Sequence, residues 1–190
     1  MGLNTVLVPA YWDLTEPVEG QFDFSLTDKV IDQARKNHLK IIFLWFGAWK
    51  NSMSCYAPLW FKENYQKYPR SYTENGKPLE IASAFSEEVF KADNRAFCQW
   101  MKHIASIDKE EGTVIMIQIE NEIGMLESAR DHSALANKAF HATVPEVFTS
   151  YLKKNKKQLH PQMLKKWGSQ GYKTSGTWQE LFGTDIYTDE

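Results

Sequence analysis

The chain has 190 residues, enough for one ordinary domain with a hydrophobic core. Its composition is that of a globular protein, and its net charge of −2 gives no electrostatic basis for binding nucleic acid or an anionic membrane. Two cysteines are too few for a disulfide framework. The five histidines lack metal-ligand spacing and no glycine-rich phosphate loop is present, so we expect no metal or other cofactor.

Three segments are nearly continuous in apolar and β-prone residues, namely 3–12, 39–49 and 113–119. Such runs are typical of strands buried on both faces. Between them, residues 25–37 and 86–107 have apolar residues at helical spacing, and in the second segment Phe90, Phe97, Met101 and Ile104 share one face. The alternation of strand and helix predicts parallel strands joined by helical crossovers.

Residues 51–85 are expected to form a long loop after the second strand. It is rich in aromatic residues, and in parallel α/β proteins the loops at the carboxyl ends of strands build the site. A later helix begins at Pro145, with Val147, Phe148, Tyr151 and Leu152 on its buried face. Two more helical segments are expected at residues 161–167 and 177–182.

No stretch reaches the ~18 apolar residues expected of a membrane helix. The first residues show no basic region followed by an apolar stretch, so no signal peptide is visible.

The segment Gln118-Ile119-Glu120-Asn121-Glu122-Ile123-Gly124 follows the apolar run 114–117. A carboxyl at the point where a buried strand emerges is expected to be half desolvated, which raises its pKa and lets it donate a proton to a leaving oxygen. An amide beside it can hydrogen-bond a sugar hydroxyl. Glu122 and Asn121 therefore predict half of a sugar-cleaving site.

Two segments carry a family resemblance. Residues 11–24, YWDLTEPVEGQFDF, resemble the Trp…Glu-Pro-x-x-Gly-x-(Tyr/Phe)-Asp-Phe signature that follows the second strand of clan A glycoside hydrolases. Residues 117–124 resemble the fourth-strand Gln-x-Glu-Asn-Glu-x-Gly segment of glycoside hydrolase family 35, the β-galactosidases. Residues 44–51 and Pro9 depart from the usual pattern, so the chain resembles a divergent bacterial branch of that family.

The resemblance implies a (β/α)8 barrel and retaining hydrolysis of a terminal β-galactoside. It also implies that Glu122 is the acid/base, that Asn121 contacts the hydroxyl next to the reacting carbon, and that a second glutamate, the nucleophile, comes from strand seven. A periplasmic or secreted location in a bacterium is suggested as well.

The chemistry of retention needs two carboxyls roughly 5–5.5 Å apart on opposite sides of the sugar. On a regular strand Glu120 projects to the same side as Glu122, so it would approach the sugar from the same direction and we disfavour it as the nucleophile. We expect it instead in a polar network with Gln118 at the barrel mouth, within reach of substrate.

Further substrate contacts are expected from four residues. For Trp12 and Trp49, core packing and sugar stacking both remain open, since aromatic rings serve both. Asn51 and Tyr56 follow the second predicted strand, close to the expected cleft.

Only three strand–helix units can be counted, whereas a closed barrel has eight. Residues 1–190 are therefore expected to form a partial catalytic α/β domain, about strands two to four, without the first strand and the C-terminal half. The nucleophile would then lie beyond Glu190, and the isolated chain should be inactive. Unpaired strand edges and apolar surface would favour binding to the remainder of the barrel or self-association.

Two other functions stay open. One is a catalytically silent fragment that binds oligosaccharide through the aromatic cleft. The other is a clan A hydrolase of different specificity, such as a β-glucosidase or β-mannosidase.

Overall fold

The computed structural model describes residues 2–125 and 128–184. Its elements, in chain order, are β1 (Thr5–Tyr11), α1 (Trp12–Thr15), α2 (Ser25–Lys36), β2 (Lys40–Lys50), α3 (Leu59–Lys62), β3 (Arg70–Tyr72), β4 (Pro78–Ala82), α4 (Glu87–Asp108), β5 (Val114–Asn121), α5 (Ala134–Phe140), α6 (Glu146–Lys154), the 3-10 helix η1 (Lys156–Gln158), α7 (Pro161–Ser169) and α8 (Trp178–Phe182).

Three parallel strands form the main sheet, in the order β1-β2-β5. Central strand β2 pairs with β1 from Thr5↔Lys40 to Tyr11↔Phe46, and with β5 from Ile41↔Val114 to Lys50↔Asn121. The predicted order of strand, helix, strand, helix, strand is confirmed, as is the parallel pairing that follows from it.

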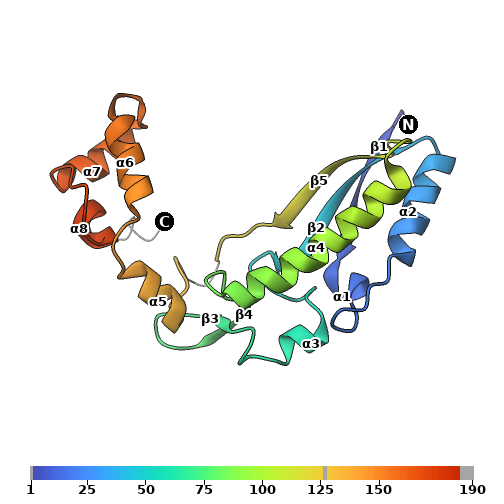
Figure 1. Ribbon diagram of the computed structural model, residues 1–190, viewed down its shortest axis with the longest axis horizontal. Helices are drawn as coiled ribbons and strands as arrows, with labels where there is room; N and C mark the ends of the chain where they lie inside the picture. Colours follow the sequence, from blue (N-terminus) through green and yellow to red (C-terminus); the bar gives the residue numbers. More distant parts are fainter. Residues whose placement is uncertain (1, 126–127, 185–190) are drawn as a thin grey trace.

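One face of the sheet is covered by α2 and α4 (Figure 1). From β2, Phe43 and Trp45 are buried against Trp100 of α4, with ring centroids 5.2 Å apart in each pair. The Trp100 indole also donates a hydrogen bond of 2.9 Å to the hydroxyl of Thr27 on α2. The core therefore lies between the sheet and these two helices.

The opposite face is open, and burial on both faces was the wrong prediction for the outer strands. Leu7 of β1 is 64% exposed and Met116 of β5 is 59% exposed. Within the described residues, β1 and β5 each pair on one edge only. The expectation of unpaired edges and apolar surface is thus confirmed.

Residues 51–85 are more ordered than the predicted loop. They contain α3 and the antiparallel hairpin β3–β4, whose turn places Gly76 at φ +80°. The carboxylate of buried Asp131 accepts a hydrogen bond from the backbone of Tyr72 and a second from the hydroxyl of Ser83, so the hairpin is tied to the segment before α5.

The helices at the C-terminal end pack around a second, smaller cluster that includes Leu152, Trp167 and Leu181 (Figure 1). The helix after Pro145 and the helical segments at 161–167 and 177–182 are confirmed. The predicted buried face of α6 is partly wrong, because Val147 and Tyr151 are exposed while Thr149 is buried. No helix in the described ranges has the length and apolarity needed to cross a membrane.

Asp108, at the end of α4, gives the fold a dependence on acid pH. Its Oδ1 accepts a 2.7 Å hydrogen bond from Arg35 of α2, and its Oδ2 accepts one of 2.7 Å from the backbone of Val114. Burial acts to raise the pKa of Asp108, but the hydrogen bonds from Val114, Arg35 and Thr113 outweigh it and lower that pKa below 3.8. The carboxylate therefore stabilises the fold above its unfolded-state pKa, and this contribution is lost as pH falls through the lower folded value.

Replacing Asp108→Asn should lower the free energy of unfolding by about 2–3 kcal/mol at neutral pH, because charged hydrogen bonds are lost. The difference from wild type should shrink as the pH falls below about 4. Urea denaturation followed by tryptophan fluorescence over this pH range measures both quantities. A difference that stays constant with pH would contradict the assignment.

Candidate active site

The carboxyl ends of β2 and β5 meet at one edge of the sheet, where they are joined through two asparagines. The backbone N–H of Asn51 donates to the carbonyl of Asn121 at 2.9 Å, and the side-chain amide of Asn121 donates to Oδ1 of Asn51 at 2.6 Å. Gln118 donates to Oδ1 of Asn121 at 2.8 Å. Two of the predicted substrate-binding residues, Asn51 and Asn121, are therefore brought together, and the Asn121 amide is held from two sides.

The backbone at this edge is strained. Asn51, Ser52, Glu120 and Glu122 all have left-handed φ values, between 49° and 59°. Such a conformation costs a non-glycine residue of order 1–3 kcal/mol and persists only where the surrounding structure enforces it, commonly at functional sites. The concentration of four such residues around Asn121 supports this edge as the site.

Glu122 follows directly after β5, at the strand end where the sequence predicted it. Its side chain is exposed to solvent, so the expectation of a half-buried carboxyl at this position is wrong in this structure. In the described chain, β5 has no strand partner on its outer edge. The role of Glu122 as acid/base stays a prediction.

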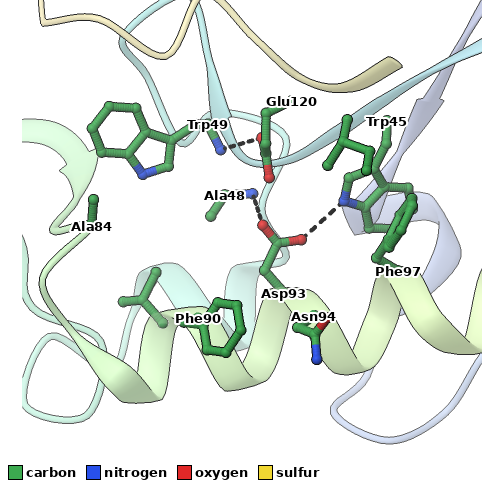
Figure 2. A pocket seen from close by; sticks show the side chains of 11 residues that line it. Trp45, Ala48, Trp49, Ala84, Phe90, Asp93, Asn94, Phe97 and Glu120 are labelled. Atoms are coloured by element: carbon green, nitrogen blue, oxygen red, sulfur yellow. Dashed lines mark hydrogen bonds between the residues drawn. The ribbon is translucent and has the colours of Figure 1, made fainter. Parts of the chain in front are cut away.

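Glu120 is the partly buried carboxyl of this edge, and it points into a pocket between β2, β5 and α4 (Figure 2). The pocket encloses about 270 Å³ and its wall is largely apolar, with the aromatic residues Trp45, Trp49, Phe90 and Phe97. Oε2 of Glu120 accepts a 2.9 Å hydrogen bond from the backbone of Trp49. This network lies on the α4 side of the sheet, not on the side of Gln118 as the strand alternation predicted.

The carboxylate of Asp93, on α4, lies beside Glu120 in the same pocket (Figure 2). Burial, together with the hydrogen bond and the negative charge of Asp93, raises the pKa of Glu120 to about 10. Glu120 is therefore protonated at neutral pH. A carboxyl with a raised pKa does exist at this strand end, and it is that of Glu120.

Asp93 was not among the site residues predicted from the sequence. Its Oδ1 accepts a 2.9 Å hydrogen bond from the Trp45 indole, and its Oδ2 accepts one of 3.1 Å from the backbone of Ala48. A signal was present, because Asp93 lies beside the buried positions Val89, Ala92 and Ala96 of an amphipathic helix, where an acidic residue needs a partner.

The aromatic residues that were predicted to contact the substrate lie in different environments. Trp12 has no exposed surface and donates a 2.8 Å hydrogen bond to Glu16, so in this structure it is a core residue with nothing open to a ligand. Trp49 is partly buried and lines the pocket. Tyr56 is also partly buried and packs on Tyr11 and Phe46, with centroids 4.8 and 5.5 Å away.

In the part of the chain that the structure describes, no group of three or more His, Cys, Asp or Glu residues could hold a metal ion. The side chains at this edge include carboxyl groups, amides and aromatic rings, those of Glu120, Asn121 and Trp49 among them.

The family model described as Glyco_hydro_42, Beta-galactosidase, matches residues 1–190. None of the curated proteins compared with the chain matched it. The family 35 assignment made from residues 117–124 is thus not supported, whereas the resemblance to clan A β-galactosidases is.

Solved structures with the same fold include three β-galactosidases. The enzyme from the Antarctic haloarchaeon Halorubrum lacusprofundi has 18% identity and a TM-score of 0.60, over 97% of this chain and 26% of that one. The enzyme from the psychrophilic Marinomonas ef1 has 18% identity and a TM-score of 0.57, over 88% and 23%. A catalytic mutant of a family 42 enzyme from G. stearothermophilus has 19% identity and a TM-score of 0.53, over 87% and 22%. The chain thus spans about a quarter of the length of these proteins.

Gly47 tests the pocket geometry directly. A Cβ built at this position would lie 2.3 Å from Oδ1 of Asp93, 2.5 Å from the Trp45 indole nitrogen and 2.7 Å from Oε1 of Glu120. Replacing Gly47→Ala should therefore lower the free energy of unfolding by about 1–3 kcal/mol, the usual cost of overpacking. Gly124→Ala is the matched control, since nothing lies within 4 Å of its Cβ position. Equal urea midpoints for the two variants would contradict the geometry.

Proposed function

We propose, because this chain belongs to glycoside hydrolase family 42, that it carries the acid/base half of a retaining β-galactosidase. The observation that carries the proposal is the position of Asn121 and Glu122 at the carboxyl end of β5, in an α/β fold shared with solved β-galactosidases. The ligand is a terminal β-galactoside, free or at the end of an oligosaccharide.

In this mechanism Glu122 protonates the leaving oxygen while a second carboxylate attacks the sugar. Water then releases the sugar, with Glu122 acting as base. Its solvent-exposed side chain is free to reach a ligand bound over the sheet edge. Asn121, oriented by Asn51 and Gln118, is placed to donate to the hydroxyl next to the reacting carbon.

The second carboxylate is proposed to come from outside this chain. The three parallel strands correspond to about strands two to four of a (β/α)8 barrel. The open face and free edges of the sheet are consistent with contact to the remaining strands and helices of that barrel. Self-association of the chain is the alternative way to cover the same surfaces. The periplasmic or secreted location that the family 35 resemblance suggested is not proposed, because the family model that matches the chain is that of family 42.

Trp49, Tyr56 and Asn51 are proposed as further substrate contacts, because all three are partly exposed and lie at or after the end of β2. Glu120 is not proposed to touch the sugar, since its carboxyl is already engaged by the Trp49 backbone and by Asp93. The burial of Trp12 removes it from the proposed contacts.

Replacing Glu122→Gln in the full product of the gene should reduce kcat roughly 10²–10⁴-fold on a β-galactoside with a poor leaving group. The KM should change little, because the amide still fits the site. Aryl galactosides with good leaving groups should lose less, since they need little protonation.

Glu110→Gln is the matched control, as this exposed glutamate precedes β5 at the opposite end of the strand. A Glu122→Gln variant with wild-type kcat on every substrate would end the acid/base assignment. Sugar binding without cleavage by the wild-type product would favour the silent binding fragment. Faster cleavage of aryl glucosides or mannosides than of galactosides would favour another clan A specificity.

The 190-residue chain alone should cleave no β-galactoside, because the second of the two carboxylates that retention needs is proposed to come from outside it. Addition of a separately produced segment that supplies a strand ending in glutamate should restore activity, measured by release of a chromogenic aglycone. Activity of the isolated chain as a cooperative monomer would contradict the proposal.

A further inference from the structure

The carboxyls of Asp93 and Glu120 hold the same short stretch of β2 from two directions. Asp93 reaches it from α4 and accepts hydrogen bonds from the Trp45 indole and the Ala48 backbone. Glu120 reaches it from β5 and accepts one from the Trp49 backbone. Figure 2 shows the two carboxyl groups turned toward each other over this stretch.

Close packing accompanies these contacts. Gly47 lies between the two carboxyls, and its missing Cβ is what allows oxygens of both to approach the β2 backbone. The end of β2 is thus enclosed by one helix and one neighbouring strand.

Glu120 reaches the pocket only through its unusual backbone conformation. In a regular strand, consecutive side chains point to opposite faces. Ile119 and Glu120 nevertheless line the same pocket, and Glu120 has φ +59°. The anchored side chain thus accompanies the left-handed turn that comes immediately before Asn121 and Glu122.

We propose that Asp93 and Glu120 are positioning residues, which clamp the end of β5 to β2 and α4 and so orient Asn121 and Glu122 in the active site. This inference rests on the function proposed above. The clamp acts through the backbone of residues 119–122 and does not touch the substrate.

Protonation sets the state of the clamp. Of the residues that line the pocket, only Asp93 and Glu120 ionise, so the remaining walls supply no cation to neutralise two carboxylates. The pKa of Glu120, raised to about 10, keeps one proton on the pair at neutral pH. Below the ordinary value of 4.5, Glu120 is protonated in both folded and unfolded chains. Between 4.5 and about 10 only the folded chain keeps the proton, so stability falls as pH rises through this window.

The test compares two substitutions of Glu120 in the full product of the gene. Glutamine keeps a neutral donor for Asp93 and an acceptor for the Trp49 backbone, whereas alanine removes the clamp. We expect Glu120→Gln to keep kcat within about threefold of wild type, and Glu120→Ala to lose about tenfold or more in kcat with a smaller change in KM, because misplaced catalytic groups slow the chemical step. Asn94→Ala, on the same pocket wall, is the control and should leave kcat unchanged.

The pH dependence of the melting temperature and of kcat distinguishes this positioning role from a purely structural one. The melting temperature of Glu120→Gln should rise relative to wild type between pH 6 and pH 9.5, since the amide has no proton to lose. Wild-type kcat should fall near pH 10, and the fall should be weaker in Glu120→Gln.

Each result decides the inference. Wild-type kcat in Glu120→Ala, or an equal loss in Glu120→Gln and Glu120→Ala, would overturn the clamp while leaving the proposed function intact. Should Glu120→Ala fail to fold, Asp93→Asn replaces it, and a fall in kcat that begins at lower pH than in wild type is then expected, because Glu120 no longer faces a carboxylate. A wild-type product that cleaves no glycoside would instead contradict the proposed function. If the melting temperatures of wild type and Glu120→Gln changed in parallel with pH, the protonated state of Glu120 would be contradicted.

Discussion

The pairing of β2 with a parallel neighbour on each side is the constraint on which both the fold and the site depend. In the described chain it is the strand of the main sheet with no free edge. Its buried side chains, including Phe43 and Trp45, pack on α4, so the core is built on it. Its last residues also meet Asn121, Glu120 and Asp93. Because one strand does both, the position of the site is set by the same packing that stabilises the domain.

Helix α4 extends this control to the strand ends. Arg95 donates a 2.6 Å hydrogen bond to Glu16, a fully buried carboxylate that also accepts from the Trp12 indole and the backbone of Gly20. A buried charge is tolerated only when its hydrogen bonds are satisfied in this way, and removing one partner is costly. Two residues earlier on the helix, Asp93 holds the end of β2. The segment after β1 and the ends of β2 and β5 are thus all held in place by helix α4. A single rigid support of this kind suits a site that needs fixed geometry.

The sequence was sufficient for the elements whose periodicity is strong. The apolar runs predicted β1, β2 and β5, and the spacing at residues 25–37 and 86–107 predicted α2 and α4, because these patterns follow from the geometry of the backbone itself. Burial was predicted less well. Phe90 was placed on the apolar face of its helix yet is 64% exposed, whereas Trp100 is fully buried, because which face of a helix is covered depends on the neighbour and not on the helix. The prediction that the outer strands are buried on both faces was wrong for the same reason, since burial of a strand face also depends on the neighbour that covers it.

At the site, the location could be predicted but the directions of the side chains could not. Asn121 and Glu122 lie at the strand end as expected, and Asn51 joins them. Strand alternation failed at Glu120, because a left-handed residue breaks the period of two on which the prediction relied.

The exposure of Glu122 has a related origin. The edge of β5 that it follows carries no partner in the described chain, and Met116 on the same strand is exposed as well. A strand that paired with this edge would bury apolar surface and exclude water from the residues just beyond it. Completion of the sheet and desolvation of the proposed proton donor are therefore one and the same physical step.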